Sequence, residues 1–126
     1  MKKVITTTDA PAAIGTYSQA LQDGQVIYLS GQIPLVPETM ELISEDIDDQ
    51  INQVMDNLTA VLHAAGASLA DVVKFTVYLT DLGDFDQVNE IMALRLSEPY
   101  PARAAVQVSA LPRRAQVEID AIARVD

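Results

Sequence analysis

The sequence predicts an α+β fold in which a mixed sheet carries two helices on one face. Apolar residues recur at helical spacing in two segments and alternate with polar residues at strand spacing in others, and the expected order is β, β, helix, β, helix, β, β. The 126 residues are 49% hydrophobic and 21% charged, which is ordinary composition for a folded chain. We therefore expect a single domain over residues 1–126.

The first third of the chain favours strands. Residues 4–7 and 26–30 have strand composition. Gly24 and Gly31 bracket the second of these segments and are candidate turn or bulge positions.

The longest helical pattern runs between Ser44 and Gly66. Ser44 can cap the helix, the acids that follow it favour the positive end of the helix dipole, and Gly66 is a natural stop. His63, the only histidine, lies beside the apolar stripe and is expected on the surface. The stripe itself consists of Ile47, Ile51, Val54, Met55, Leu58, Val61, Leu62 and Ala65.

The second half predicts a strand, a helix and two closing strands. Residues 73–80 alternate apolar with polar side chains, the period of a half-buried strand. A helix should begin near Asp84 and end before Pro99, because proline cannot continue it. Residues 103–109 and 116–124 then read as strands, which we expect to pair as neighbours.

The sheet face away from the helices has no predicted cover. We expect Tyr78, Ala105, Gln107 and Ile122 on it, a mixture too apolar for a well-solvated face. This favours association with other copies of the chain. A monomer with a solvated sheet face is the alternative.

Composition excludes several classes of function. The net charge of -10, from 18 acidic and 8 basic residues, disfavours nucleic-acid binding, which depends mainly on Lys and Arg contacts. The N-terminus lacks an export signal and no apolar stretch is long enough to span a membrane, so we expect a cytoplasmic protein without membrane contact. The absence of cysteine excludes disulfides and thiolate chemistry.

Few motifs for known chemistries are present. The five glycines are too scattered to form a dinucleotide-binding or phosphate-binding loop, and a single histidine disfavours a serine–histidine triad. The acids at 45–49 are explained as helix N-terminal residues, so no metal site is expected. Arg103 and Glu118 remain, expected on adjacent strands and on faces opposite the core. Taken alone, a structural ion pair or two solvated charges is the favoured interpretation of this pair.

Four stretches together resemble the RidA (YjgF) family. The match spans nearly the whole chain, and the last stretch is the most specific because an intervening Leu-Pro separates its Pro-Ala-Arg from its Glu-Ile at the family's spacing. The stretches are APAAIGTYSQA at 10–20, LSGQIPL at 29–35, DVVKFTVYLTDLGDFDQVNEI at 71–91 and PARAAVQVSALPRRAQVEIDAIA at 101–123.

The resemblance implies a fold similar to bacterial chorismate mutase, assembled as a homotrimer with clefts between subunits. It also implies hydrolysis of 2-aminoacrylate and related enamines or imines, such as 2-iminobutanoate and 2-iminopropanoate, to 2-keto acids and ammonia. Pyridoxal-phosphate-dependent dehydratases release these compounds. The partner is then a small imine or keto acid, with no cofactor and no metal.

The resemblance assigns the main chemical roles to Arg103 and Glu118. A planar guanidinium can bind a carboxylate through two parallel hydrogen bonds and thereby fix the neighbouring imine carbon. Arg103 would be this anchor. Glu118, held in a partly desolvated cleft, would accept a proton from the attacking water and return it to the departing nitrogen.

Other family positions give weaker assignments. Tyr17 would close the pocket or help protonate the enamine carbon, or else anchor the N-terminal loop as a half-buried aromatic. Ser30 would donate to the substrate carboxylate or simply end a strand. Asn89 would contact substrate or occupy the polar side of the second helix. The backbones of Gly31 and Ala105 would position substrate or water whatever side chains they carry.

The chain departs from the family at three positions. Thr16 replaces a common proline, which is expected to loosen the loop carrying Tyr17. Ala104 and Ala105 replace a serine and a cysteine, which removes any thiol-dependent regulation but no backbone group. Substrate range is the property that these changes affect.

Three other functions compete with the deaminase. The first alternative is a non-catalytic regulator that binds a small ligand in the same intersubunit pocket, and it predicts that Glu118→Gln leaves binding and phenotype intact. A ribonuclease or translation inhibitor fits poorly with the acidic charge and the single histidine. A structural or chaperone-like role predicts that Arg103→Ala leaves function intact.

Overall fold

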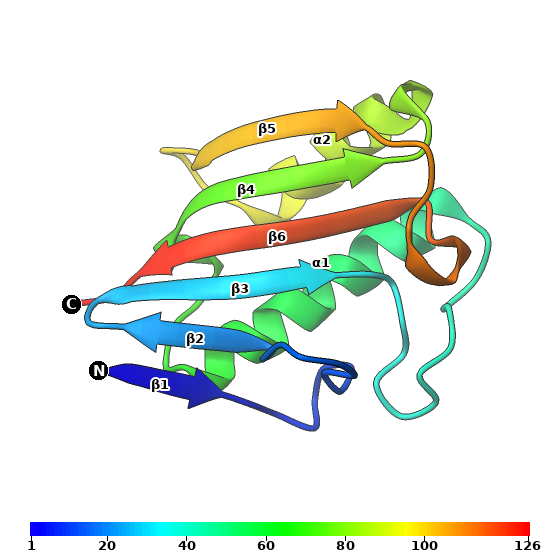
Figure 1. Cartoon of the computed structure of the whole chain (residues 1–126). Coiled ribbons are helices and arrows are strands. Elements are labelled where there is room, and N and C mark those ends of the chain that lie inside the picture. The colour runs from blue at the N-terminus through cyan, green and yellow to red at the C-terminus, as the bar shows by residue number, and fades with distance from the viewer.

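The computed structural model describes residues 1–126 and contains one six-stranded sheet in the order β1-β2-β3-β6-β4-β5. Both helices lie on the same face of this sheet (Figure 1). The predicted fold class is thus confirmed. The elements are β1 Lys2–Ile5, β2 Ala20–Asp23, β3 Val26–Gln32, α1 Ile47–Ala64, β4 Val72–Leu79, α2 Phe85–Arg95, β5 Ala102–Gln107 and β6 Val117–Arg124, with short 3₁₀ turns at Leu69–Asp71, Leu82–Asp84 and Pro112–Arg114.

The first three strands form an antiparallel meander that includes one strand missed from the sequence. Strand β2 has only four residues, and none of them is β-branched or aromatic, so its composition gives no strand signal. Gly24 lies in the two-residue turn between β2 and β3 with φ of 62°. That left-handed conformation favours glycine, as the predicted turn required.

Helix α1 follows the predicted stripe, but its cap lies later than expected. Asp46 caps the helix, and its carboxylate accepts a hydrogen bond from the Asp49 amide at 3.0 Å. Ser44 instead supports the cap: its hydroxyl accepts from the Asp46 amide and donates to the Asp49 carboxylate. Gly66 ends the helix as predicted, with φ of 76°, and His63 is exposed.

The prediction that the two closing strands pair with each other is wrong. Strand β6 lies between β3 and β4, whereas β5 lies at the sheet edge and pairs only with β4, in parallel. Packing explains the order. Every second residue of β6 is buried beneath the helices, which suits the sheet centre, while no residue of β5 is fully buried.

The hydrophobic core fills the space between the sheet and the two helices. Its largest fully buried side chains come from β3, α1, β4 and β6, among them Ile27, Met55, Phe75 and Ile119. Neither helix has the length and apolar composition that crossing a membrane requires.

The composition of the open sheet face differs in part from the prediction. Tyr78 and Ile122 lie on it, but Ala105 and Gln107 do not, because the parallel register places them beside the buried Val77 and Leu79 on the helix face. The open face also presents Val4, Tyr28 and Val106, each substantially exposed. The open face therefore carries exposed apolar side chains, as predicted, but some of the residues differ from those predicted.

Candidate active site

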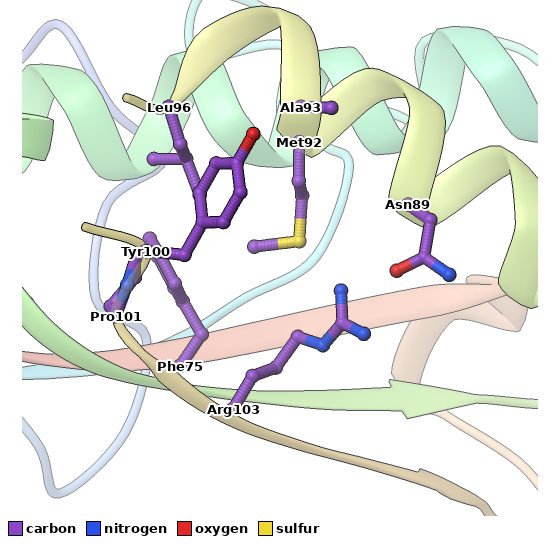
Figure 2. Close-up of a pocket in the computed structure, with 8 residues that line it drawn as sticks. All are labelled: Phe75, Asn89, Met92, Ala93, Leu96, Tyr100, Pro101 and Arg103. Carbon is purple, nitrogen blue, oxygen red and sulfur yellow. The ribbon is translucent and has the colours of Figure 1, made fainter. Parts of the chain in front are cut away.

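A pocket of about 320 Å³ lies between the edge strand β5 and helix α2. Figure 2 shows the Arg103 side chain pointing into this pocket, toward Asn89 and Met92 of α2. Five of the eight lining residues are hydrophobic. The pocket thus combines one cation with mostly apolar walls, and its full lining is Phe75, Asn89, Met92, Ala93, Leu96, Tyr100, Pro101 and Arg103.

Arg103 has no acidic partner in the chain. The only ion pair is Arg95 with Asp56, and no protein group hydrogen-bonds the Arg103 guanidinium. Its guanidinium carbon lies 5.0 Å from the centroid of the Phe85 ring, within the range of a cation–π contact. Phe85 therefore orients a guanidinium whose donors are free for an anion.

The prediction that Arg103 lies on the sheet face away from the core is wrong. Strand β5 pairs in parallel with β4 and places Arg103 beside the buried Phe75, so its side chain lies on the helix face of the sheet. Glu118 lies on the open face, as predicted, because its neighbours Val117 and Ile119 are buried beneath the helices. The two side chains cannot form an ion pair within one chain.

Glu118 occupies a half-buried position on the central strand β6. Burial raises the pKa of its carboxyl above the ordinary value of 4.5, and the negative charge of Asp120 raises it further. Tyr78 of β4 stands directly opposite Glu118 in the register, and its hydroxyl donates to the Asp120 carboxylate at 2.9 Å. Sequence reasoning placed Tyr78 on this face but missed the contact with Asp120.

Gly31 lies against the Glu118 side chain. It sits where the β3–β6 register shifts, and a Cβ atom there would lie 2.9 Å from Glu118 Cδ and 3.1 Å from Cγ, with the carboxylate oxygen closer still. A substitution of Gly31 therefore cannot leave the site unchanged, contrary to the expectation that only its backbone matters.

Tyr17 and Ser30 lie near this end of β3. Tyr17 and Gly31 both line a second pocket, of about 250 Å³, which also includes Arg113. The Ser30 hydroxyl donates to the Ser18 carbonyl at 2.6 Å and so ties the loop that carries Tyr17 to the sheet. Tyr17 itself is 53% exposed.

The structure thus sorts the predicted site residues into two groups. Arg103, Asn89 and Ala105 lie on the helix side of the sheet, where Ala105 packs against the core. The remaining four lie around the C-terminal end of β3, near the open face of the sheet: Tyr17, Ser30, Gly31 and Glu118. Sequence reasoning missed Phe85, whose only signal was its place at the start of a helix that packs over β5.

Comparison with known proteins decides the family. The family model described as Endoribonuclease L-PSP matches residues 7–125. The crystal structure of RidA from an Antarctic Psychrobacter species is 55% identical, covers 98% of this chain and 99% of its own, and superposes with a TM-score of 0.94. The chain belongs to the RidA (YjgF) family.

One further relative is named for an activity, and another has a structure with a bound ligand. A mouse protein, 50% identical over 98% of this chain and 91% of its own, is named 2-iminobutanoate/2-iminopropanoate deaminase. The structure of Escherichia coli TdcF with bound serine is 42% identical, covers 98% of this chain and 99% of its own, and has a TM-score of 0.93. Names within the family thus differ between deaminase and endoribonuclease, so family membership supports a deaminase without fixing the substrate.

Proposed function

We propose that the chain hydrolyses small enamines and imines of the 2-aminoacrylate type, including 2-iminobutanoate and 2-iminopropanoate, to 2-keto acids and ammonia. The free guanidinium of Arg103 carries this proposal. It is a cation without an acidic partner, in a pocket with mostly apolar walls. A carboxylate with a short carbon tail complements such a pocket in charge and in polarity.

Arg103 holds the substrate carboxylate through two parallel hydrogen bonds and fixes the imine carbon beside it. An enamine first takes a proton from water on its terminal carbon and becomes the protonated imine. Glu118 takes a proton from water as the water oxygen bonds to the imine carbon, and later returns that proton to the nitrogen as the carbon–nitrogen bond breaks. The new hydroxyl gives up its own proton to Glu118 as the keto oxygen forms, and Glu118 passes it to the released ammonia. Ammonia leaves and the 2-keto acid remains. A raised pKa suits Glu118 to this exchange, because proton transfer is most efficient when the pKa of the catalytic group approaches the working pH.

The remaining site residues have supporting roles. Asn89, on the helix that covers Arg103, contacts the bound substrate. Tyr17 closes the cleft, and the Ser30 hydroxyl turns its single proton from the Ser18 carbonyl to the substrate carboxylate when substrate binds. The backbones of Gly31 and Ala105 position substrate and water.

The site forms between copies of the chain, in a homotrimer. Arg103 and Glu118 lie on opposite faces of one sheet, with strand β4 between their strands, so a single copy does not present them to one substrate. Arg103 of one copy and Glu118 of the next would complete each site. The exposed apolar side chains of the open face support association of this kind.

A coupled assay tests the reaction. Threonine or serine dehydratase supplies the imine, semicarbazide traps what stays unhydrolysed, and the protein is added as wild type, Arg103→Ala or Arg124→Ala. Arg124 is the matched control, an exposed arginine bonded to Gln25. We expect wild type and Arg124→Ala to lower semicarbazone formation, and Arg103→Ala to lose about 100-fold or more in kcat/KM, since charged hydrogen bonds contribute about 1.5–3 kcal/mol each. Full activity of Arg103→Ala contradicts the proposal.

Mixing inactive variants tests whether the site is shared. Arg103→Ala and Glu118→Gln are each expected to be inactive. In a cyclic trimer assembled at random from equal amounts, about a quarter of the sites would combine an intact Arg103 with an intact Glu118. Recovery of about a quarter of wild-type activity is the expected result. No recovery from verified mixed trimers would place both residues in one copy.

The serine bound to TdcF also supports the alternative of a non-catalytic ligand-binding regulator. Glu118→Gln separates the two functions. A regulator keeps its effect on its partner when Glu118 is amidated, whereas the deaminase loses turnover and keeps substrate affinity.

A further inference from the structure

The open face of the sheet holds a second carboxylate beside Glu118. The side chains of Glu118 and Asp120 lie on the same face of β6, because side chains two residues apart in a strand share a face, and they are about 7 Å apart along the strand. Tyr78 faces Glu118 directly, and its hydroxyl reaches to Asp120, where it donates at 2.9 Å. The three side chains form one cluster on adjacent strands.

Few other charges of the same copy lie near this cluster. Arg113 lines the pocket that includes Gly31, and the proposed trimer adds Arg103 of the next copy, whose positive charge acts on Glu118 in the opposite direction to Asp120. From β4, Lys74 faces the same side but pairs with Ile122, so it lies farther along β6 from Glu118 than Asp120 does. From β3, Tyr28 shares the face, and from β5 only the uncharged Ala104 and Val106 do. Neither carboxylate of the cluster forms an ion pair.

We infer that Asp120, held by Tyr78 on the same face as Glu118, is a positioning residue whose nearby carboxylate favours proton delivery by Glu118 to the departing nitrogen. This inference rests on the proposed role of Glu118 and adds a group that acts on it without touching substrate. Two carboxylates at this distance repel each other when both are ionised, and the half-buried setting weakens solvent screening.

The hydrogen bond fixes the place of Asp120 in the cluster. Tyr78 donates to the Asp120 carboxylate at 2.9 Å and holds it on the same face as Glu118. Burial and the charge of Asp120 both raise the pKa of Glu118. The result is a division of roles, in which one carboxylate supplies a fixed negative charge and the other exchanges a proton.

This arrangement matters most for the second half of the reaction. The departing nitrogen needs a proton from Glu118. Glu118 can supply it only if its carboxyl is still protonated when the carbon–nitrogen bond breaks. Asp120 favours that protonated form. Without the charge of Asp120, Glu118 becomes the weaker base.

Asp120→Asn is a matched test, because the asparagine side chain keeps the shape and an oxygen acceptor for Tyr78 while it removes the charge. The Glu118 carboxyl carbon is titrated by ¹³C NMR in the full-length protein as wild type, Asp120→Asn and Asp120→Glu. We expect the pKa of Glu118 to fall by about half a unit or more in Asp120→Asn, from the Coulomb repulsion lost at about 7 Å. Asp120→Glu should restore most of the wild-type value.

Kinetics separate this inference from the proposed function. The acid limb of kcat/KM should move down by the same amount in Asp120→Asn and stay in place in Asp86→Asn, an exposed acid on α2. An unchanged pKa of Glu118 in Asp120→Asn overturns the inference. A lowered pKa with an unmoved acid limb supports the coupling and instead overturns the role of Glu118 as the proton-transfer group.

Discussion

Gly31→Ala should abolish most activity while leaving the chain folded. The Cβ atom would meet Glu118 rather than backbone, with Cδ at 2.9 Å and Cγ at 3.1 Å. Carbon atoms in ordinary contact lie about 3.5–4.0 Å apart, so the Glu118 carboxyl must retreat by about 0.6 Å or more. The backbone at Gly31 does not need a left-handed conformation, so strain in the main chain does not complicate the result.

The displacement has unequal effects on stability and on catalysis. A side chain pushed off its preferred rotamer costs about 0.5–1.5 kcal/mol, which lowers Tm by about 4 °C for a chain of this size. A catalytic group moved by about 1 Å can lose about 100-fold in rate. We therefore expect kcat to fall by one to two orders of magnitude, roughly, with a modest change in Tm.

The measurements are kcat from the coupled semicarbazide assay and Tm from thermal unfolding. Gly83→Ala is the control, since it is also a glycine without a left-handed φ and its added Cβ would meet only Asp81, in a surface turn. Wild-type kcat in a folded Gly31→Ala variant would refute the reasoning. It would mean either that Glu118 is free to move without loss or that its position is irrelevant to turnover.

Three further predictions follow from contacts of the site. Phe85→Leu should raise KM about two- to five-fold by removing a cation–π contact that orients Arg103, and Phe85→Tyr should not; equal KM values for both variants would exclude this role. Ser30→Ala should lose about 1 kcal/mol in urea unfolding, because its hydroxyl no longer ties the Ser18 carbonyl. The Tm of Glu118→Gln should rise relative to that of wild type as pH increases above 4.5. Because the pKa of Glu118 is raised on folding, folded wild type binds this proton more tightly than the unfolded chain does, so wild type loses stability as the pH rises from 4.5 through the folded pKa. The gain should vanish below pH 4.5, and a Tm difference that is constant with pH would contradict it.

Periodicity was sufficient to predict the helices and the central strands. The stripe that begins at Ile47 and the alternation through Phe75 both reflect burial on one face, and burial is what the pattern records. The helix is capped by Asp46 rather than by the predicted Ser44. Both side chains can accept an amide hydrogen bond, and the path of the chain into the helix decides which of them caps it. Strand β2 was missed because its four residues are held by their neighbours rather than by their own preference.

Strand order was the step that periodicity could not supply. Alternation shows that Arg103 and Ala105 share a face, but it does not show which face of the sheet that is. The mostly exposed β5 gave little indication, and its parallel pairing with β4 was needed to place Arg103 beneath α2. The site residues were therefore named from the sequence, while their separation into two groups required the fold.

The separation itself constrains how copies of the chain can associate. Arg103 lies on an edge strand, whose outer side has no pairing partner, whereas Glu118 lies on a central strand and is open only from the helix-free face. A shared site must then form where the edge of one sheet meets the open face of another. Such a contact joins two different surfaces, and contacts of that kind close into rings when the rotation allows. The trimer proposed above is one such ring, and it would use every Arg103 and every Glu118 once.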